Sequence, residues 1–164
     1  MTPRTLLLTL ALAASPAAFA CESLWLSPGG VSEHFGTKSN DAPRHYPERN
    51  EMNEAHTGLA FECELPHGAI AVGDLKNSVD QRMRYVSATK RYSVTPAIGV
   101  RYGVMGMQYQ YTKNGTLQRN TGAFPIVAGE LRLGRLGANV VFLPKFSAVS
   151  YYSVLFFQIK WQIF

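Results

Sequence analysis

Long apolar runs are missing from the sequence after its first twenty residues. A membrane-spanning α-helix needs about 18 to 20 consecutive apolar residues, and no later stretch approaches that length. Beyond residue 30, apolar residues also do not recur at helical spacing. These absences exclude a helical membrane protein and favour a fold built from strands.

Cysteine and charge are also scarce. Cys21 and Cys63 are the two cysteines, and without a companion Cys or His cluster they do not indicate a zinc site. Only 16% of the residues are charged, and 16 Lys and Arg against 11 Asp and Glu give a formal charge of +5. No run of five or more basic residues occurs. We therefore expect no nucleic-acid partner, no metal and no cofactor.

The first twenty residues have the pattern of a secretory signal peptide. Arg4 supplies the positive charge, residues 6–14 form a short apolar segment, and Ala18-Phe19-Ala20 matches a small-x-small cleavage site. The mature chain then begins near Cys21 in a compartment that permits disulfides. Two fates stay open for Cys21, namely lipidation and a disulfide with Cys63.

Short segments that alternate between apolar and polar residues predict an all-β fold. In residues 57–65, for example, Leu59, Phe61 and Cys63 alternate with smaller or charged residues. Turn residues such as Pro66-His67-Gly68 separate the segments. We expect eight strands, at about residues 30–35, 57–65, 69–75, 84–92, 98–111, 125–133, 138–143 and 155–163.

The predicted connections alternate between long and short. Residues 36–56, 76–83, 112–124 and 144–152 are long, whereas 66–68, 93–97 and 134–137 are short. Outer-membrane barrels have long extracellular loops and short periplasmic turns. We therefore predict one eight-stranded antiparallel outer-membrane β-barrel over residues 21–164, located in the cell outer membrane as a monomer. A secreted β-sandwich is the alternative fold.

A barrel in lipid places its polar side chains inside, where opposite charges can pair. The alternation assigns seven residues to the interior, and we expect a structural role for them. Trp25 is expected to anchor the chain at the periplasmic interface. Pro125 and Pro144 are expected at strand ends, where missing donors either mark lateral openings or simply end the strands. The seven interior residues are Glu62, Glu64, Arg101, Glu130, Arg132, Gln158 and Lys160.

Two polar groups are expected on the same outer rim. His34 lies near the outer end of the first predicted strand, and Lys76-Asn77-Ser78 follows the third. With Tyr46-Pro47-Glu48-Arg49 and Gly58 between them, their order and approximate spacing resemble those of lipid A palmitoyltransferases of the Gram-negative outer membrane (PagP type), over residues 30–92. The sequence resembles a divergent member of this family, because Asn77 stands where the family has Asp and no N-terminal helix is possible.

The resemblance implies transfer of an acyl chain from a phospholipid to lipid A. It implies catalytic roles at His34, Ser78 and the Asn77 position, with substrate contacts at Tyr46, Glu48, Arg49 and Lys76. Asn cannot orient or charge-stabilise an imidazole as a carboxylate does, so Asp74 or Asp80 is a possible substitute. The aromatic terminal residue, Phe164, is expected to engage the outer-membrane assembly machinery.

The same residues also permit a non-catalytic barrel with a structural, adhesive or lipid-binding role. His34 would then pair with Glu33 or a loop carboxylate, and Ser78 would cap a turn. His45, His56 and His67 follow His34 at intervals of eleven residues, a spacing that matches no metal-ligand pattern and that we interpret as coincidence. Four carboxylates in the first long loop either bind divalent cations or, as we favour, are simply solvated. These are Asp41, Glu48, Glu51 and Glu54.

Overall fold

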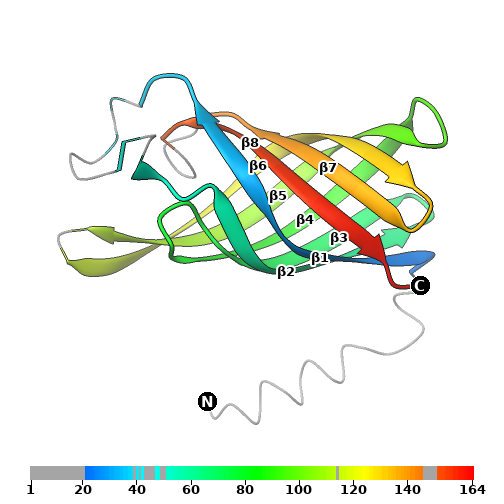
Figure 1. The fold of residues 1–164 in the computed structure, drawn as a ribbon, viewed down its shortest axis with the longest axis horizontal. Coiled ribbons are helices and arrows are strands. Elements are labelled where there is room, and N and C mark those ends of the chain that lie inside the picture. Colours follow the sequence, from blue (N-terminus) through cyan, green and yellow to red (C-terminus); the bar gives the residue numbers. More distant parts are fainter. Residues whose placement is uncertain are drawn as a thin grey trace, which may run out of the picture.

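The protein is a closed barrel of eight antiparallel strands in which every strand pairs with its sequence neighbours and the last pairs with the first (Figure 1). The computed structural model describes residues 21–38, 40, 42, 47–48, 51–113, 115–145 and 151–164. The predicted barrel is confirmed, and the sandwich alternative is wrong. The strands are β1 (Ser23–Phe35), β2 (Ala55–Leu65), β3 (Gly68–Lys76), β4 (Arg82–Ser93), β5 (Ile98–Lys113), β6 (Thr116–Leu133), β7 (Leu136–Leu143) and β8 (Ser153–Gln162).

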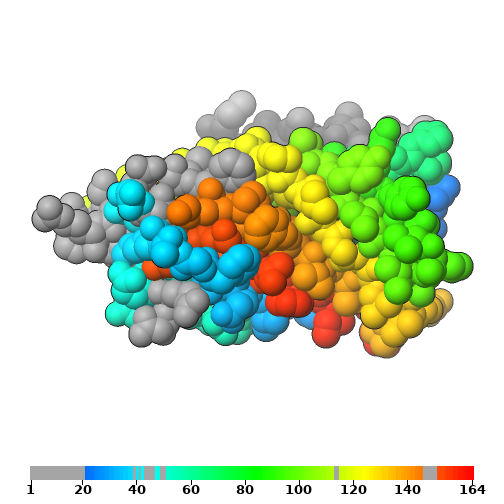
Figure 2. Space-filling model, turned by 90° about the horizontal axis from the view of Figure 1, so that it is seen from above, coloured from blue at the N-terminus to red at the C-terminus, as the bar shows by residue number. Residues whose placement is uncertain are grey.

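The three short turns lie at one end of the barrel, together with the C-terminus (Figure 1). In Figure 2 the strands β1, β8 and β7 lie side by side on one face, which shows how the barrel closes. None of the described residues belongs to a helix long and apolar enough to cross a membrane. The predicted signal peptide, residues 1–20, lies outside the described residues.

Two strands, β6 and β1, are longer than the sequence predicted by seven residues or more. The predicted third long loop, 112–124, is wrong, because Gly115 (φ 74°) makes a tight turn and β6 begins at Thr116, paired with Lys113. Polar residues occupy both faces of this hairpin, so it has no apolar alternation for the prediction to find. β1 likewise begins at Ser23, and its register shifts between Ser27 and Gly29. The Pro28-Gly29-Gly30 segment is thus a β-bulge inside a strand.

The outer surface of the barrel is apolar, the reverse of a soluble protein, and the charged side chains predicted for the interior lie inside it. The apolar residues that alternate with the predicted interior residues of β2, β5 and β8 face outward. At the loop end, the polar side chains of Asp74, Arg82 and Arg84 replace the apolar ones on the outer face. The exposed apolar residues include Leu59, Phe61, Val72, Val86, Val100, Tyr102, Val104, Val127, Phe142, Phe157, Ile159 and Trp161.

The interior at the turn end is filled by an ion-pair cluster centred on the buried Glu130. Its carboxylate accepts hydrogen bonds from Lys160 Nζ (2.6 Å) and Arg101 Nε (2.8 Å). Arg91 and Arg132 also donate to it, at 2.5 and 3.1 Å. The predicted interior positions are confirmed: Glu62 pairs with Lys160 (2.7 Å), Glu64 pairs with Arg101 and Arg132, and Gln158 is buried above them.

Trp25 is buried within this cluster, so the predicted interfacial anchor is wrong. The Nζ atom of Lys160 lies 4.9 Å from the centre of its ring and the guanidinium carbon of Arg132 lies 5.5 Å away. The indole Nε1 donates to Ser23 Oγ (3.0 Å). The bulge accounts for this placement, because an added residue reverses the face to which the preceding part of β1 points.

Cys21 and Cys63 form a disulfide, with Cα atoms 5.2 Å apart. The bridge ties the residues before β1 to β2, beside the pairing of Leu24 with Cys63. Of the two fates left open by the sequence, the structure has the disulfide. Closing a loop between residues 42 positions apart stabilises a fold by about 2–4 kcal/mol in typical cases.

Removing the charge of Glu130 should destabilise the barrel strongly. In Glu130→Gln the buried cations lose their shared anion, and such a loss typically costs about 3–5 kcal/mol. Urea unfolding in detergent micelles, followed by tryptophan fluorescence, measures the change. Asp74→Asn is the matched control, because its ion pairs are about half exposed and such pairs are worth about 0–1 kcal/mol. Equal losses for the two variants would contradict a central role for Glu130.

Candidate functional site

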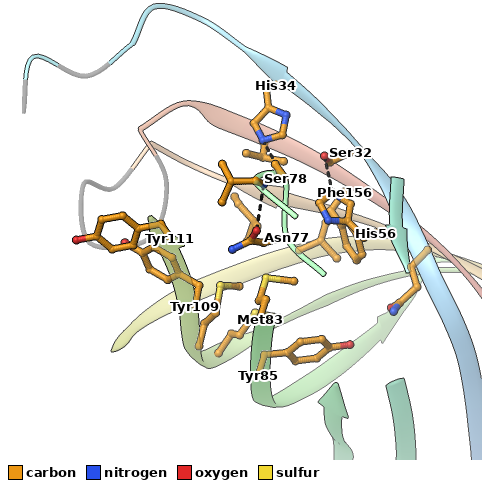
Figure 3. Close-up of a pocket in the computed structure, with 17 residues that line it drawn as sticks. Ser32, His34, His56, Asn77, Ser78, Met83, Tyr85, Tyr109, Tyr111 and Phe156 are labelled. Atoms are coloured by element: carbon orange, nitrogen blue, oxygen red, sulfur yellow. Dashed lines mark hydrogen bonds between the residues drawn. The ribbon is translucent and has the colours of Figure 1, made fainter. Parts of the chain in front are cut away.

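The loop end of the barrel interior contains an apolar pocket (Figure 3). The non-atom space within it is about 890 Å³, a figure that includes space open to solvent. Tyr85 and Gln158 line both this pocket and a smaller cavity beside Lys160, so they separate the pocket from the ion-pair cluster. The apolar lining is Val79, Met83, Tyr85, Met105, Met107, Tyr109, Tyr111, Val141, Leu143, Val154 and Phe156.

The lining follows from strand geometry. Successive side chains on a strand point to opposite faces, so Met105, Met107 and Tyr109 of β5 all face inward while Val104 faces outward. Methionine side chains are unbranched and adapt to irregular shapes. An interior that is charged at one end therefore becomes apolar and adaptable at the other.

His34 and Ser78 meet on the wall of this pocket. His34 on β1 is only 3% exposed, and its Nε2 lies 3.0 Å from the Ser78 Oγ in the β3–β4 connection. The structure thus brings together two predicted site residues that are 44 positions apart. Among the described residues, His34 Nδ1 has no hydrogen-bond partner. The alternative pairing with Glu33 is wrong, because Glu33 faces outward.

Asn77 shapes the turn that carries Ser78. Its Oδ1 accepts hydrogen bonds from the backbone N–H groups of Val79 (3.0 Å) and Gln81 (2.9 Å), and its Nδ2 donates to the Gln110 carbonyl (2.7 Å). These contacts use the amide for backbone support, and none of them reaches His34. Asn77, which occupies the site where an orienting aspartate was expected, therefore supports the turn that carries Ser78 instead of holding His34.

The two aspartates considered as substitutes are engaged elsewhere. Asp74 pairs with Arg82 and Arg84 on the outer surface. Asp80 accepts a hydrogen bond from Asn53 Nδ2 (2.9 Å) at the exposed end of the connection. No carboxylate among the described residues is hydrogen-bonded to His34 or His56.

A second imidazole–hydroxyl pair lies in the same pocket (Figure 3). His56 on β2 places its Nδ1 2.8 Å from the Lys76 carbonyl oxygen and its Nε2 2.7 Å from the Ser32 Oγ. A carbonyl oxygen only accepts, so Nδ1 carries the proton of the neutral ring. Nε2 is then free to accept from the Ser32 hydroxyl.

Sequence reasoning missed this second pair. It began the second strand at Thr57, which left His56 in a loop, and it treated the regular histidine spacing as coincidence. Ser32 and His34 share one face of β1, and His56 pairs with Gly30 of the same strand. A Ser-x-His motif on one strand was therefore the available signal.

Two glycines in the β1 bulge make room for His56. A Cβ at Gly29, whose φ is 117°, would lie 2.0 Å from the His56 carbonyl oxygen. A Cβ at Gly30 would lie 2.7 Å from the ring of Phe156, and this ring packs edge-on against His56 with centroids 5.3 Å apart. The bulge thus positions the imidazole as well as reversing the face of Trp25.

Of the remaining predicted contact residues, Lys76 and Glu48 are described and lie at the rim. Lys76 is exposed, while its carbonyl holds His56. Glu48 accepts from Lys38 Nζ (2.9 Å) and from the Tyr152 hydroxyl (3.2 Å), and these hydrogen bonds hold the pKa of Glu48 below its ordinary value. Tyr46 and Arg49, and the loop carboxylate Asp41, lie outside the described residues.

Comparisons with known proteins support the fold. No family model matches the chain, and no curated protein matches it. Among solved structures, the N-terminal β-barrel domain of Pseudomonas aeruginosa OprF aligns with a TM-score of 0.50 and 9% identity, over 87% of this chain and 98% of that one. The protein is thus an eight-stranded β-barrel with the apolar exterior of membrane-spanning barrels, and its resemblance to lipid A palmitoyltransferases stays a prediction.

We predict that the neutral ring of His56 carries its proton on Nδ1 in a single tautomer. Long-range ¹H–¹⁵N correlation spectra of the protein in micelles, at a pH where the rings are uncharged, distinguish the two tautomers. We expect a single Nδ1–H form for His56, because the Lys76 carbonyl accepts that proton. His67, in an exposed turn, should instead average between the forms. An Nε2–H form of His56 would contradict the assigned hydrogen bonds.

Proposed function

We propose that this barrel lies in the bacterial outer membrane and transfers an acyl chain from a phospholipid to lipid A. The observation that carries the proposal is the His34–Ser78 pair on the wall of an apolar pocket inside the barrel. The resemblance drawn from the sequence points to the same chemistry.

The pocket suits a hydrocarbon chain. Its lining is dominated by methionine, tyrosine and aliphatic side chains, and burying a methylene group contributes about 0.8 kcal/mol. The polar atoms of Ser32, His34, His56 and Ser78 lie on the same pocket wall. A chain inserted here would therefore bring its ester group to the imidazoles.

The position of an aromatic pair supports a site at the depth of lipid esters. Phe35, next to His34, stacks on Phe142 on the outer surface with ring centroids 6.1 Å apart. Aromatic side chains on a barrel exterior mark the border between hydrocarbon and headgroups. On the same end of the barrel, the exposed side chain of Lys76 offers a positive charge to a lipid phosphate.

A lateral opening between β6 and β7 would let an acyl chain reach the pocket from the bilayer. The β6–β7 ladder ends at Val127 and Phe142, whereas β6 continues to Thr116 with β5 alone in the described part of the chain. Pro125 lies just beyond this point, inside β6 instead of at its predicted end, and it lacks a backbone donor. Pro144 follows the last residue of β7, as expected.

The chemistry required is ordinary ester exchange. Imidazole transfers protons near neutral pH, which suits the breaking and making of an ester. The Ser78 hydroxyl can be activated by His34 or can donate a hydrogen bond to the oxyanion that develops on the ester carbonyl. A site enclosed by apolar residues strengthens such interactions by excluding water.

Lipid A from a Gram-negative host that expresses the protein should gain one acyl chain, measured by mass spectrometry. His34→Ala and Ser78→Ala should reduce the gain by at least about 100-fold, the lower range for proton-transfer groups. His67→Ala and Ser93→Ala, at the opposite rim, are matched controls that should retain it. Heat-modifiable migration on a gel confirms that each variant folds. An unchanged lipid A spectrum from a folded barrel would contradict the proposal and leave a structural, adhesive or lipid-binding role.

A further inference from the structure

We propose that Ser32 is the nucleophile of this site and forms an acyl-enzyme, with His56 as its base and the Lys76 carbonyl oxygen as the group that holds the imidazole. The inference rests on the proposed function, because it names the residues through which the acyl chain would pass. The sequence indicated His34 and Ser78 as catalytic residues, whereas this proposal assigns the nucleophile to the second pair, Ser32 and His56.

The two imidazoles differ in how they are held. His56 is anchored at both nitrogens, through Nδ1 to the Lys76 carbonyl (2.8 Å) and through Nε2 to Ser32 (2.7 Å). His34 is anchored through Nε2 alone, and its Nδ1 has no partner among the described residues. A general base needs a lone pair that stays directed at the hydroxyl, and the third group supplies that orientation. Only His56 meets this requirement.

The carbonyl of Lys76 takes the place that the missing carboxylate would fill. It precedes Asn77, whose side chain binds the backbone of the same connection at Val79 and Gln81. The turn therefore presents a fixed acceptor to His56, although no carboxylate among the described residues is hydrogen-bonded to the ring. A carboxylate beside a catalytic histidine fixes the tautomer of the ring and also stabilises its positive charge. A neutral carbonyl supplies the first of these two effects.

The location of the pair fits a nucleophile. Ser32 and His56 are 4% and 5% exposed, both lie on strands, and both line the pocket proposed for the acyl chain. Strands hold side chains more rigidly than the connection that carries Ser78. His34 Nε2–H can donate to Ser78 Oγ, which leaves the hydroxyl proton of Ser78 available. Ser78 can then donate that proton in a hydrogen bond to the oxyanion.

In the first half-reaction, Ser32 Oγ bonds to the ester carbonyl carbon of the donor lipid and its proton passes to His56 Nε2. The bond from that carbon to the lipid alcohol oxygen breaks, and His56 returns the proton to this oxygen as the lysolipid leaves. In the second half, a hydroxyl of the acceptor lipid attacks the acyl-serine ester and gives its proton to His56. The Ser32–acyl bond breaks, and Ser32 Oγ recovers that proton.

The test uses the mature protein in detergent micelles, treated with a fluorophosphonate that carries a long alkyl chain. Such a reagent phosphonylates an activated serine with loss of fluoride. Intact-mass measurement gives the number of labels and peptide fragmentation locates them. We expect one label on Ser32 in the wild-type protein. His56→Gln should slow labelling by at least about 100-fold, because the base is lost.

Three serine variants complete the test. Ser32→Ala should lose the label, and Ser78→Ala should keep it on Ser32. The control Ser87→Ala removes a buried serine of β4 that hydrogen-bonds no histidine among the described contacts, and it should label like the wild type. The position of the label in the wild-type protein decides the matter even where a variant does not fold.

The outcomes separate this inference from the proposed function. A label on Ser78, or an unlabelled wild-type protein that still adds an acyl chain to lipid A, would overturn Ser32 as the nucleophile and leave the acyltransferase activity intact. A label on Ser32 with an unchanged lipid A spectrum would support the nucleophile and remove lipid A as the acceptor. An unlabelled protein with an unchanged lipid A spectrum would overturn both.

Discussion

Closure of the hydrogen-bond ladder between β1 and β8 is the constraint on which the rest of the structure depends. A backbone surrounded by hydrocarbon must satisfy its N–H and C=O groups internally, and a closed sheet does so without leaving an edge. Once closed, the sheet has one face toward lipid and one face toward its own interior. Within the apolar band, polar side chains on the strands must then point inward, so the groups that stabilise the barrel and the groups proposed for chemistry lie in the same interior.

The barrel interior has two parts with different physical roles. Around Glu130, carboxylates and cations neutralise one another at the turn end. Tyr85 and Gln158 separate that region from a pocket lined mainly by methionine, tyrosine and aliphatic residues. The charged half fixes the barrel, because moving any of its strands would leave an unpaired buried charge. The adaptable half is the part in which we propose that an acyl chain binds.

The pocket holds two hydroxyl–imidazole pairs instead of the single group that the sequence indicated. His34 and Ser78 form one pair, and His56 and Ser32 form the other. Asn77 stands where the resembled family has an aspartate, and the group bound to an imidazole nitrogen in this structure is the Lys76 carbonyl, which holds His56. Two pairs in one pocket allow a division of labour, in which one activates a nucleophile and the other stabilises charge on the ester.

The sequence by itself determined the barrel, its inward charges and the outward apolar faces of β2, β5 and β8, because lipid enforces a period of two along each spanning strand. It also located His34 and Ser78 on the same rim. It did not determine the start of β6, because residues 118–121 are polar on both faces of the strand and show no alternation. The tertiary structure alone decided that Trp25 points inward and that His56 meets Ser32. Both depend on the bulge at Gly29, since one added residue changes the facing and register of β1 against its neighbours.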